Sequence, residues 1–199
     1  ANPLLKGVPK DAVSKYDKAI EKIEKKDYKA AQMLLDEAIV AHPNFAAAYY
    51  EKGSAYLKDN DPDKALESFV KAIQIKPDYV EAKYSVGYTQ YLKKNYEVAA
   101  AVFDDVLKQK AMPEAHMYNG ISLLMLKNAD AAEAQLKKAI AAKDGEGVAL
   151  AHRYLGGIYV QKKRNAEAAA ELQKYLDLAP KTPDAARIKT TIEDLKKQS

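Results

Sequence analysis

Two sets of small residues recur along this chain in one register. The first set is Ala19, Gly53, Gly87, Gly120 and Gly156, and the second is Ala31, Ala65, Ala99, Ala132 and Ala168. Both sets advance by 34, 34, 33 and 36 residues. Two independent markers that keep the same steps indicate an internal repeat. We therefore predict five similar units, each of which contacts mainly its neighbours along the chain.

Residues 46–79 show what one repeat should fold into. Their first half places apolar and aromatic side chains at helical spacing around Gly53, which leaves room for a second helix to approach closely. Asp61 and Pro62 match an N-cap followed by a proline at the first helical position. A second apolar face follows and ends at Pro77. Two short helices cannot bury both apolar faces alone, so the pairs must stack on one another.

The marker residues of this stretch resemble those of a known family. They are Tyr49, Gly53, Tyr56, Ala65, Phe69, Ala72 and Pro77. Their order and spacing resemble the tetratricopeptide repeat (TPR), a helix–turn–helix unit of about 34 residues. The resemblance extends over residues 12–182 of the 199. It implies an all-α fold, a right-handed α-solenoid of about five repeats, and a role in protein binding.

The repeat register also predicts the domain organisation. We expect an N-terminal arm at residues 1–11 and a C-terminal capping helix at residues 183–199. Between them, the repeats are expected at residues 12–45, 46–79, 80–113, 113–148 and 149–182. Thr182 and Pro183 match an N-cap and a first-position proline for the last helix. That helix has one apolar and one charged face, which is typical of an element that closes the end of a stack.

Composition argues against catalysis and against metal or cofactor binding. The chain has no Cys, so thiolate zinc sites, disulfides and thiol nucleophiles are excluded. His42, His116 and His152 are the only histidines, and no zinc-protease, calcium-loop or phosphate-loop motif occurs. His116 and His152 occupy the aromatic place of a first helix, where packing is the expected role. We predict a non-enzymatic protein with no cofactor and no metal site.

The charges are nearly balanced and are interspersed along the chain. Thirty-two basic and 28 acidic residues give a net charge of +4. This pattern favours a solvated surface over a nucleic-acid footprint. No apolar run approaches the roughly 18 to 20 residues that a transmembrane helix requires. We therefore expect neither a nucleic-acid partner nor a membrane span.

The tyrosines fall into two groups. One group occupies places that the repeat uses for packing: Tyr28, Tyr49, Tyr56, Tyr96 and Tyr159. The other group shares groove-facing places of the first helices with apolar and polar side chains. That candidate partner-binding groove comprises Tyr16, Tyr50, Tyr84, Tyr88, Tyr91, Met117, Ile121, Leu124 and Arg153. Aromatic and Met side chains there suit a peptide or amphipathic helix.

Two alternatives to this groove stay open. The irregular first repeat permits a one-residue register shift, which would put Tyr16 in the core. The groove residues could also serve only to seal adjacent repeats together. One familiar ligand mode of the family is not expected, because repeats that clamp the carboxylate of heat-shock chaperones carry Asn after the repeat glycine. This chain has Ser54, Tyr88, Ile121 and Gly157 at those places.

The predicted function is a scaffold whose concave groove binds a peptide or helix of a partner protein, with the partner's identity open. The alternative is a self-associating structural subunit of a homo-oligomer. The sequence leaves the oligomeric state open and favours a monomer slightly. The first residue is not Met, which fits either a removed signal peptide or a trimmed chain. The location is therefore open between the cytoplasm and the periplasm or exterior.

Overall fold

The computed structural model describes residues 3–143 and 145–198, and these residues form helices and turns without any strand. They divide into two compact units, residues 1–94 and 95–199. Unit 1 contains the short 3₁₀ helix η1 (Pro3–Leu5) and the helices α1 (Lys10–Glu24), α2 (Tyr28–Ala41), α3 (Ala46–Lys58), α4 (Pro62–Ile75) and α5 (Val80–Leu92). Unit 2 contains α6 (Tyr96–Gln109), α7 (Pro113–Met125), α8 (Ala129–Ala142), η2 (Glu146–Val148), α9 (Ala149–Gln161), α10 (Asn165–Leu178) and α11 (Ala185–Lys197).

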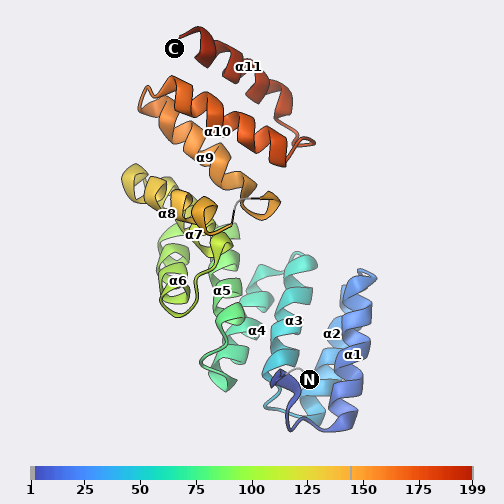
Figure 1. Cartoon of the computed structure of the whole chain (residues 1–199). Coiled ribbons are helices and arrows are strands. Elements are labelled where there is room, and N and C mark those ends of the chain that lie inside the picture. The colour runs from blue at the N-terminus through green and yellow to red at the C-terminus, as the bar shows by residue number, and fades with distance from the viewer. Residues whose placement is uncertain (1–2, 144, 199) are drawn as a thin grey trace. The chain divides into compact units, whose positions relative to one another are not determined.

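The helices of each unit pack in the order of the chain (Figure 1). In unit 1, α1 pairs with α2 and α3 pairs with α4, while α2 contacts α3 and α4 contacts α5. In unit 2, α7 pairs with α8 and α9 pairs with α10, while α6 packs on α7 and α11 packs on α10. This neighbour-by-neighbour packing of helix pairs confirms the predicted all-α repeat array.

Each turn between the first and second helix of a repeat contains one residue in the left-handed helical region. These residues are Lys26, Asn60, Lys94, Lys127 and Lys163, with φ between 57° and 63°. They keep the repeat steps of 34, 34, 33 and 36 residues. The next residue is the N-cap of the following helix. Asp27, Asp61 and Asn128 cap it by accepting a hydrogen bond from the backbone N–H three residues later.

The glycine places hold the helix pairs together at close range. A Cβ atom on Gly53 would lie 2.6 Å from the Phe69 ring. A Cβ atom on Gly156 would lie 2.7 Å from the Leu172 side chain. Both distances are too short for a real side chain, so the second helix of each pair occupies the space that the missing side chain leaves. The role predicted for Gly53 is confirmed.

Both ends of the chain differ from the expectations. Residues 3–5 of the predicted arm form η1, which packs against α3, and α1 begins at Lys10. Leu4 packs against the cores around both α1 and α3. At the other end α11 begins after Asp184, so Thr182 is not its N-cap. The Thr182 hydroxyl instead donates a hydrogen bond to the Asp184 carboxylate, at 2.7 Å. Residues 1–2, Asp144 and Ser199 lie outside the described residues.

The helices described by the structure are all too short or too polar to cross a bilayer. The longest of them, α1, has 15 residues.

Candidate protein-binding surfaces

The structure places three of the predicted groove residues in the core. Tyr16 is 8% exposed, and its ring centroid lies 5.2 Å from that of Phe45, so Tyr16 lies in the core, as the first alternative for it predicted. Met117 and Ile121 on α7 are 2% and 1% exposed. Side chains this deeply buried offer almost no area to a partner. We therefore remove these three residues from the candidate surface and assign them to packing.

Tyr50 has an intermediate position. Its side chain is half-buried, and its ring centroid lies 5.1 Å from that of Tyr79 and 5.8 Å from that of Phe69. Tyr50 thus seals α3 and α4 to the start of α5 while part of its ring stays accessible. Burial is the main cause that raises the pKa of its hydroxyl.

The tyrosines of α5 form a ladder along one face of that helix. The ring of Tyr84 stacks on that of Tyr88 with centroids 6.4 Å apart, and Tyr88 stacks on Tyr91 at 6.2 Å. The three residues are spaced four and three positions apart, which places them on one helical face. All three are half-buried. The ladder is a partly accessible aromatic surface within unit 1.

The last two predicted residues, Leu124 and Arg153, line a pocket in unit 2 with a volume of about 410 Å³. We call it the α9 pocket, because most of its wall comes from that helix. Its lining comprises Leu124 from α7, Arg153, Tyr154, Gly157, Ile158, Val160 and Gln161 from α9, Leu172 from α10, and Arg187, Ile188 and Thr191 from α11. Gly157 has open space where a Cβ atom would lie. The missing side chain therefore widens the pocket.

One carboxylate, that of Asp184, contacts both arginines that line the α9 pocket. Arg153 donates two hydrogen bonds to Oδ2 of Asp184, at 3.0 Å from Nε and 2.6 Å from Nη2. Hydrogen bonds from Thr182 and Arg153 lower the pKa of Asp184 to about 2. Arg187 contacts the same oxygen at 3.4 Å from an exposed position. One carboxylate thus faces two guanidinium groups, which leaves a net positive charge beside the apolar walls.

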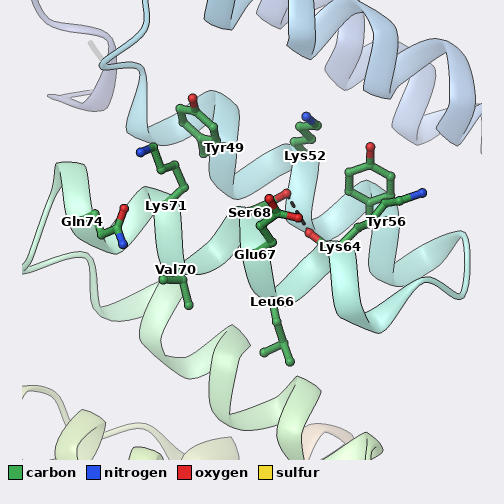
Figure 2. Close-up of a pocket in the computed structure, with 10 residues that line it drawn as sticks. All are labelled: Tyr49, Lys52, Tyr56, Lys64, Leu66, Glu67, Ser68, Val70, Lys71 and Gln74. Atoms are coloured by element: carbon green, nitrogen blue, oxygen red, sulfur yellow. Dashed lines mark hydrogen bonds between the residues drawn. The ribbon is translucent and has the colours of Figure 1, made fainter.

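A larger hollow of about 730 Å³ lies on α3 and α4 of unit 1 (Figure 2). Tyr49, Lys52 and Tyr56 extend from α3, whereas Leu66 and Val70 extend from α4 in the opposite direction. Two of its three lysines pair with carboxylates of the protein. Lys52 pairs with Asp36 at 2.6 Å, and Lys64 pairs with Asp61 at 3.2 Å. None of the predicted groove residues lines this hollow, and its internal ion pairs favour a structural role.

The tyrosines assigned to packing are buried to different extents. Tyr159 is 3% exposed, with the Arg164 guanidinium 4.1 Å from its ring centroid. The other four tyrosines predicted to lie in the core are only half-buried: Tyr28, Tyr49, Tyr56 and Tyr96.

Sequence reasoning also missed Tyr79, which is 5% exposed. A signal for it was present, because Phe45, Tyr79, Met112 and Val148 precede successive first helices at the repeat steps.

The two histidines of the aromatic place make equivalent contacts. Nδ1 of His116 lies 2.7 Å from Oε1 of Gln135, and Nδ1 of His152 lies 2.5 Å from Oε2 of Glu171. Each contact joins the first helix of a pair to the second. Both histidines therefore have the packing role that was expected. In the part of the chain that the structure describes, no three His, Cys, Asp or Glu side chains gather in a metal-binding arrangement.

Comparisons with protein families give one consistent result. Models described as tetratricopeptide repeat match residues 46–79, 93–147 and 120–183, which together span more than half of the chain. Among curated proteins, DnaJ homolog subfamily C member 3 of Gallus gallus is 28% identical over 93 residues. The matching region is 47% of this chain and 18% of that protein, so the chain spans only a small part of the length of this relative.

Solved structures show the same fold at low sequence identity. PilW, a type IV pilus biogenesis factor, superimposes with a TM-score of 0.77 at 22% identity, covering 96% of this chain and 92% of that one. YrrB, described as a TPR protein with an unusual peptide-binding site, superimposes with a TM-score of 0.71 at 22% identity, covering 90% and 92%. At such identities the likeness concerns the fold alone.

Proposed function

Because the chain belongs to the tetratricopeptide repeat family, we propose that it is a protein-binding module that captures a short helix or an extended peptide of a partner protein. The family typically mediates protein–protein interactions and is generally non-catalytic. The finer part of the proposal is the binding mode. A partner segment with spaced apolar side chains would place one of them in the α9 pocket.

The observation that carries this proposal is the shape and chemistry of the α9 pocket. Its lining includes Leu124 from α7 and Val160 from α9, whose side chains stay accessible, and the opening beside Gly157 is not filled by any side chain. An apolar pocket with a few charged groups at its edge is the usual form of a peptide-anchoring site. The tyrosine ladder of α5 supports the same function in unit 1, since rigid aromatic side chains supply contact area at low entropic cost.

The test fills the pocket without disturbing the packing. Gly157→Leu places a side chain in open space, so the variant should fold and should lose the ligand. Peptides selected from a displayed random library on the unmodified chain would be measured against both proteins by fluorescence anisotropy. Ala170→Leu, which adds the same side chain to an exposed position on α10, is the control and should bind normally. Equal binding by Gly157→Leu would reject the α9 pocket as the site.

A second candidate function is self-association, and one observation favours it. Met33 and Val40 are 67% and 82% exposed and lie seven residues apart on one side of α2. The corresponding places of the other repeats hold only Ala or polar residues: Glu67, Ala101, Ala134, Ala170, Gln74, Lys108, Ala141 and Asp177. Exposed apolar pairs of this kind often mark contact surfaces. Light scattering over a range of concentrations, with Met33→Glu and Val40→Glu as variants, would detect an oligomer that depends on them.

A further inference from the structure

Both charged residues that line the α9 pocket are arginines. Arg153 extends from α9 and Arg187 from α11, and among the described residues no acidic side chain belongs to the lining. The hollow on α3 and α4 differs, because Glu67 lines it together with three lysines (Figure 2). The charge in the lining of the α9 pocket is therefore of one sign. A ligand group of the opposite charge complements it.

Arg153 is fixed by contacts within the protein. Its Nε and Nη2 both donate to Oδ2 of Asp184, at 3.0 and 2.6 Å, and its guanidinium lies 5.7 Å from the centroid of the Tyr154 ring. Its side chain is 31% exposed. These contacts hold the guanidinium of Arg153 in the pocket wall, where Asp184 compensates its charge.

Arg187 is much less constrained. Its side chain is 74% exposed, and Nη2 lies 3.4 Å from Oδ2 of Asp184. That oxygen already accepts the two shorter hydrogen bonds from Arg153, and Oδ1 accepts one from Thr182 at 2.7 Å. Within residues 3–143 and 145–198, no other hydrogen bond or ion pair of the Arg187 guanidinium is present. A guanidinium has five N–H donors, so most of those of Arg187 stay open to a ligand.

The open guanidinium lies beside the apolar part of the same pocket. Leu124 and Val160 also line the pocket and stay accessible, and Gly157 leaves open space between the helices. Consecutive residues of a peptide are only about 3.8 Å apart at their Cα atoms. Two neighbouring ligand residues are therefore able to share this pocket, one on the apolar walls and one at Arg187.

We propose that Arg187 binds the side-chain carboxylate of an Asp or Glu residue of the partner protein, next to the apolar residue that enters the α9 pocket. The guanidinium would donate two parallel N–H···O hydrogen bonds to the carboxylate, a geometry that a lysine ammonium group does not offer. This inference rests on the proposed protein-binding function and adds the charge of the partner segment. It requires an acidic residue beside the apolar anchor.

The test uses blocked dipeptides as probes and needs no partner protein. Acetyl-leucyl-glutamyl methylamide would be titrated into the full chain at 0.05 M salt, with the methyl signals of Leu124 and Val160 followed by NMR. The glutaminyl analogue has nearly the same shape without the charge, and the lysyl analogue carries the opposite charge. We expect the glutamyl probe to bind about three to five times more tightly than the glutaminyl probe, because an exposed ion pair contributes modestly. The lysyl probe should bind most weakly.

Substitutions on α11 then assign the preference to one side chain. Arg187→Gln should make the glutamyl and glutaminyl probes bind equally, and the exposed position of Arg187 favours normal folding of this variant. Lys189→Gln removes the same charge at an exposed place outside the pocket lining, so it is the control and should keep the preference. Arg187→Glu should reverse the order, so that the lysyl probe binds more tightly than the glutamyl probe.

The outcomes separate this contact from the pocket itself. Equal affinity of the glutamyl and glutaminyl probes for the unmodified chain would overturn the acidic contact and leave the pocket in place, and so would an unchanged preference in Arg187→Gln. Tighter binding of acetyl-leucylglycine, whose carboxylate lies at the chain end, would overturn the assignment to a side chain. Gly157→Leu should abolish binding of every probe. Binding that persists in that variant, or no saturable shift with any probe, would reject the pocket and the contact together.

Discussion

At the scale of single residues, the structure shows a backbone strain that composition does not reveal. Four of the five left-handed turn residues are lysines, and the fifth is Asn60. For a lysine this conformation costs roughly 1 to 2 kcal/mol, because the Cβ atom crowds the following carbonyl oxygen. Nothing in the spacing of apolar residues marks these positions, although they keep the repeat register. Their strain is a property of the tight turn that joins each helix pair.

Replacing a strained lysine should therefore stabilise the fold. We expect Lys163→Gly to raise the free energy of unfolding by about 0.5 to 1 kcal/mol, since glycine adopts positive φ without steric cost. Lys189→Gly, within α11, should lower it by about as much. Urea unfolding of the three proteins measures both changes. A loss of stability at both positions would contradict the turn geometry described above.

Two adjacent glycines of α9 provide a second test. Gly156→Ala should destabilise by about 1 to 3 kcal/mol, because the new methyl group would meet Leu172 at 2.7 Å. Gly157→Ala should stabilise by about 0.5 to 1 kcal/mol, because its methyl group enters open space and alanine favours the helix. Thermal unfolding of the pair should show changes of opposite sign. Changes of the same sign would mean that α9 is rotated relative to α10.

At the scale of helices, a charge cluster joins consecutive pairs in unit 2. Glu133 on α8 binds Lys137 at 2.6 Å on its own helix and reaches Lys162 and Arg164, at 2.7 and 3.3 Å, in the turn between α9 and α10. Hydrogen bonds from Lys137 and Lys162 lower the pKa of Glu133 to about 2. Arg164 is the residue that stands where Asp27, Asp61 and Asn128 cap the earlier helices. It replaces a cap with an ion pair between repeats.

This cluster predicts a pH dependence with a definite sign. Because the pKa of Glu133 is lower in the folded chain than its ordinary value of 4.5, its contribution is complete above about pH 5 and is lost as the pH falls towards 2. Glu133→Gln should cost about 1 to 3 kcal/mol at pH 7 and almost nothing near pH 2. Denaturant unfolding of both proteins from pH 2 to 7 gives this difference directly. A difference that does not change with pH would exclude the ionic mechanism.

The capping helix carries the other prediction at this scale. Ile188, Ile192 and Leu195 are buried, at 4 to 6% exposure, on the side of α11 that packs on α10. Ending the chain at Thr182 should expose the apolar side of α10 and promote aggregation. Analytical ultracentrifugation and the melting temperature of the shortened chain would test this. Ending the chain at Asp194 should have a smaller effect, because Ile188 and Ile192 remain.

At the scale of the whole molecule, the repeat register continues through both units while the charges stay balanced. The net charge is only +4, from 32 basic and 28 acidic residues. Long-range steering of a partner is therefore expected to be weak. Peptides that occupy the α9 pocket should lose less than about threefold in affinity between 0.05 and 0.3 M salt, since apolar contacts are not screened. A steep fall with salt would indicate a polar binding mode instead.

The sequence by itself determined the helix pairs, the repeat steps, the close contact at Gly53 and the cap at Asp61. These features follow from helical spacing and local turn chemistry, which depend only on residues close together in the sequence. The tertiary structure decided which tyrosines are buried and which remain accessible. Tyr16 belongs to the core because Phe45, which lies directly before α3, packs on it. The burial of such a side chain depends on its contacts with residues of other helices. Those contacts form only when the helices stack.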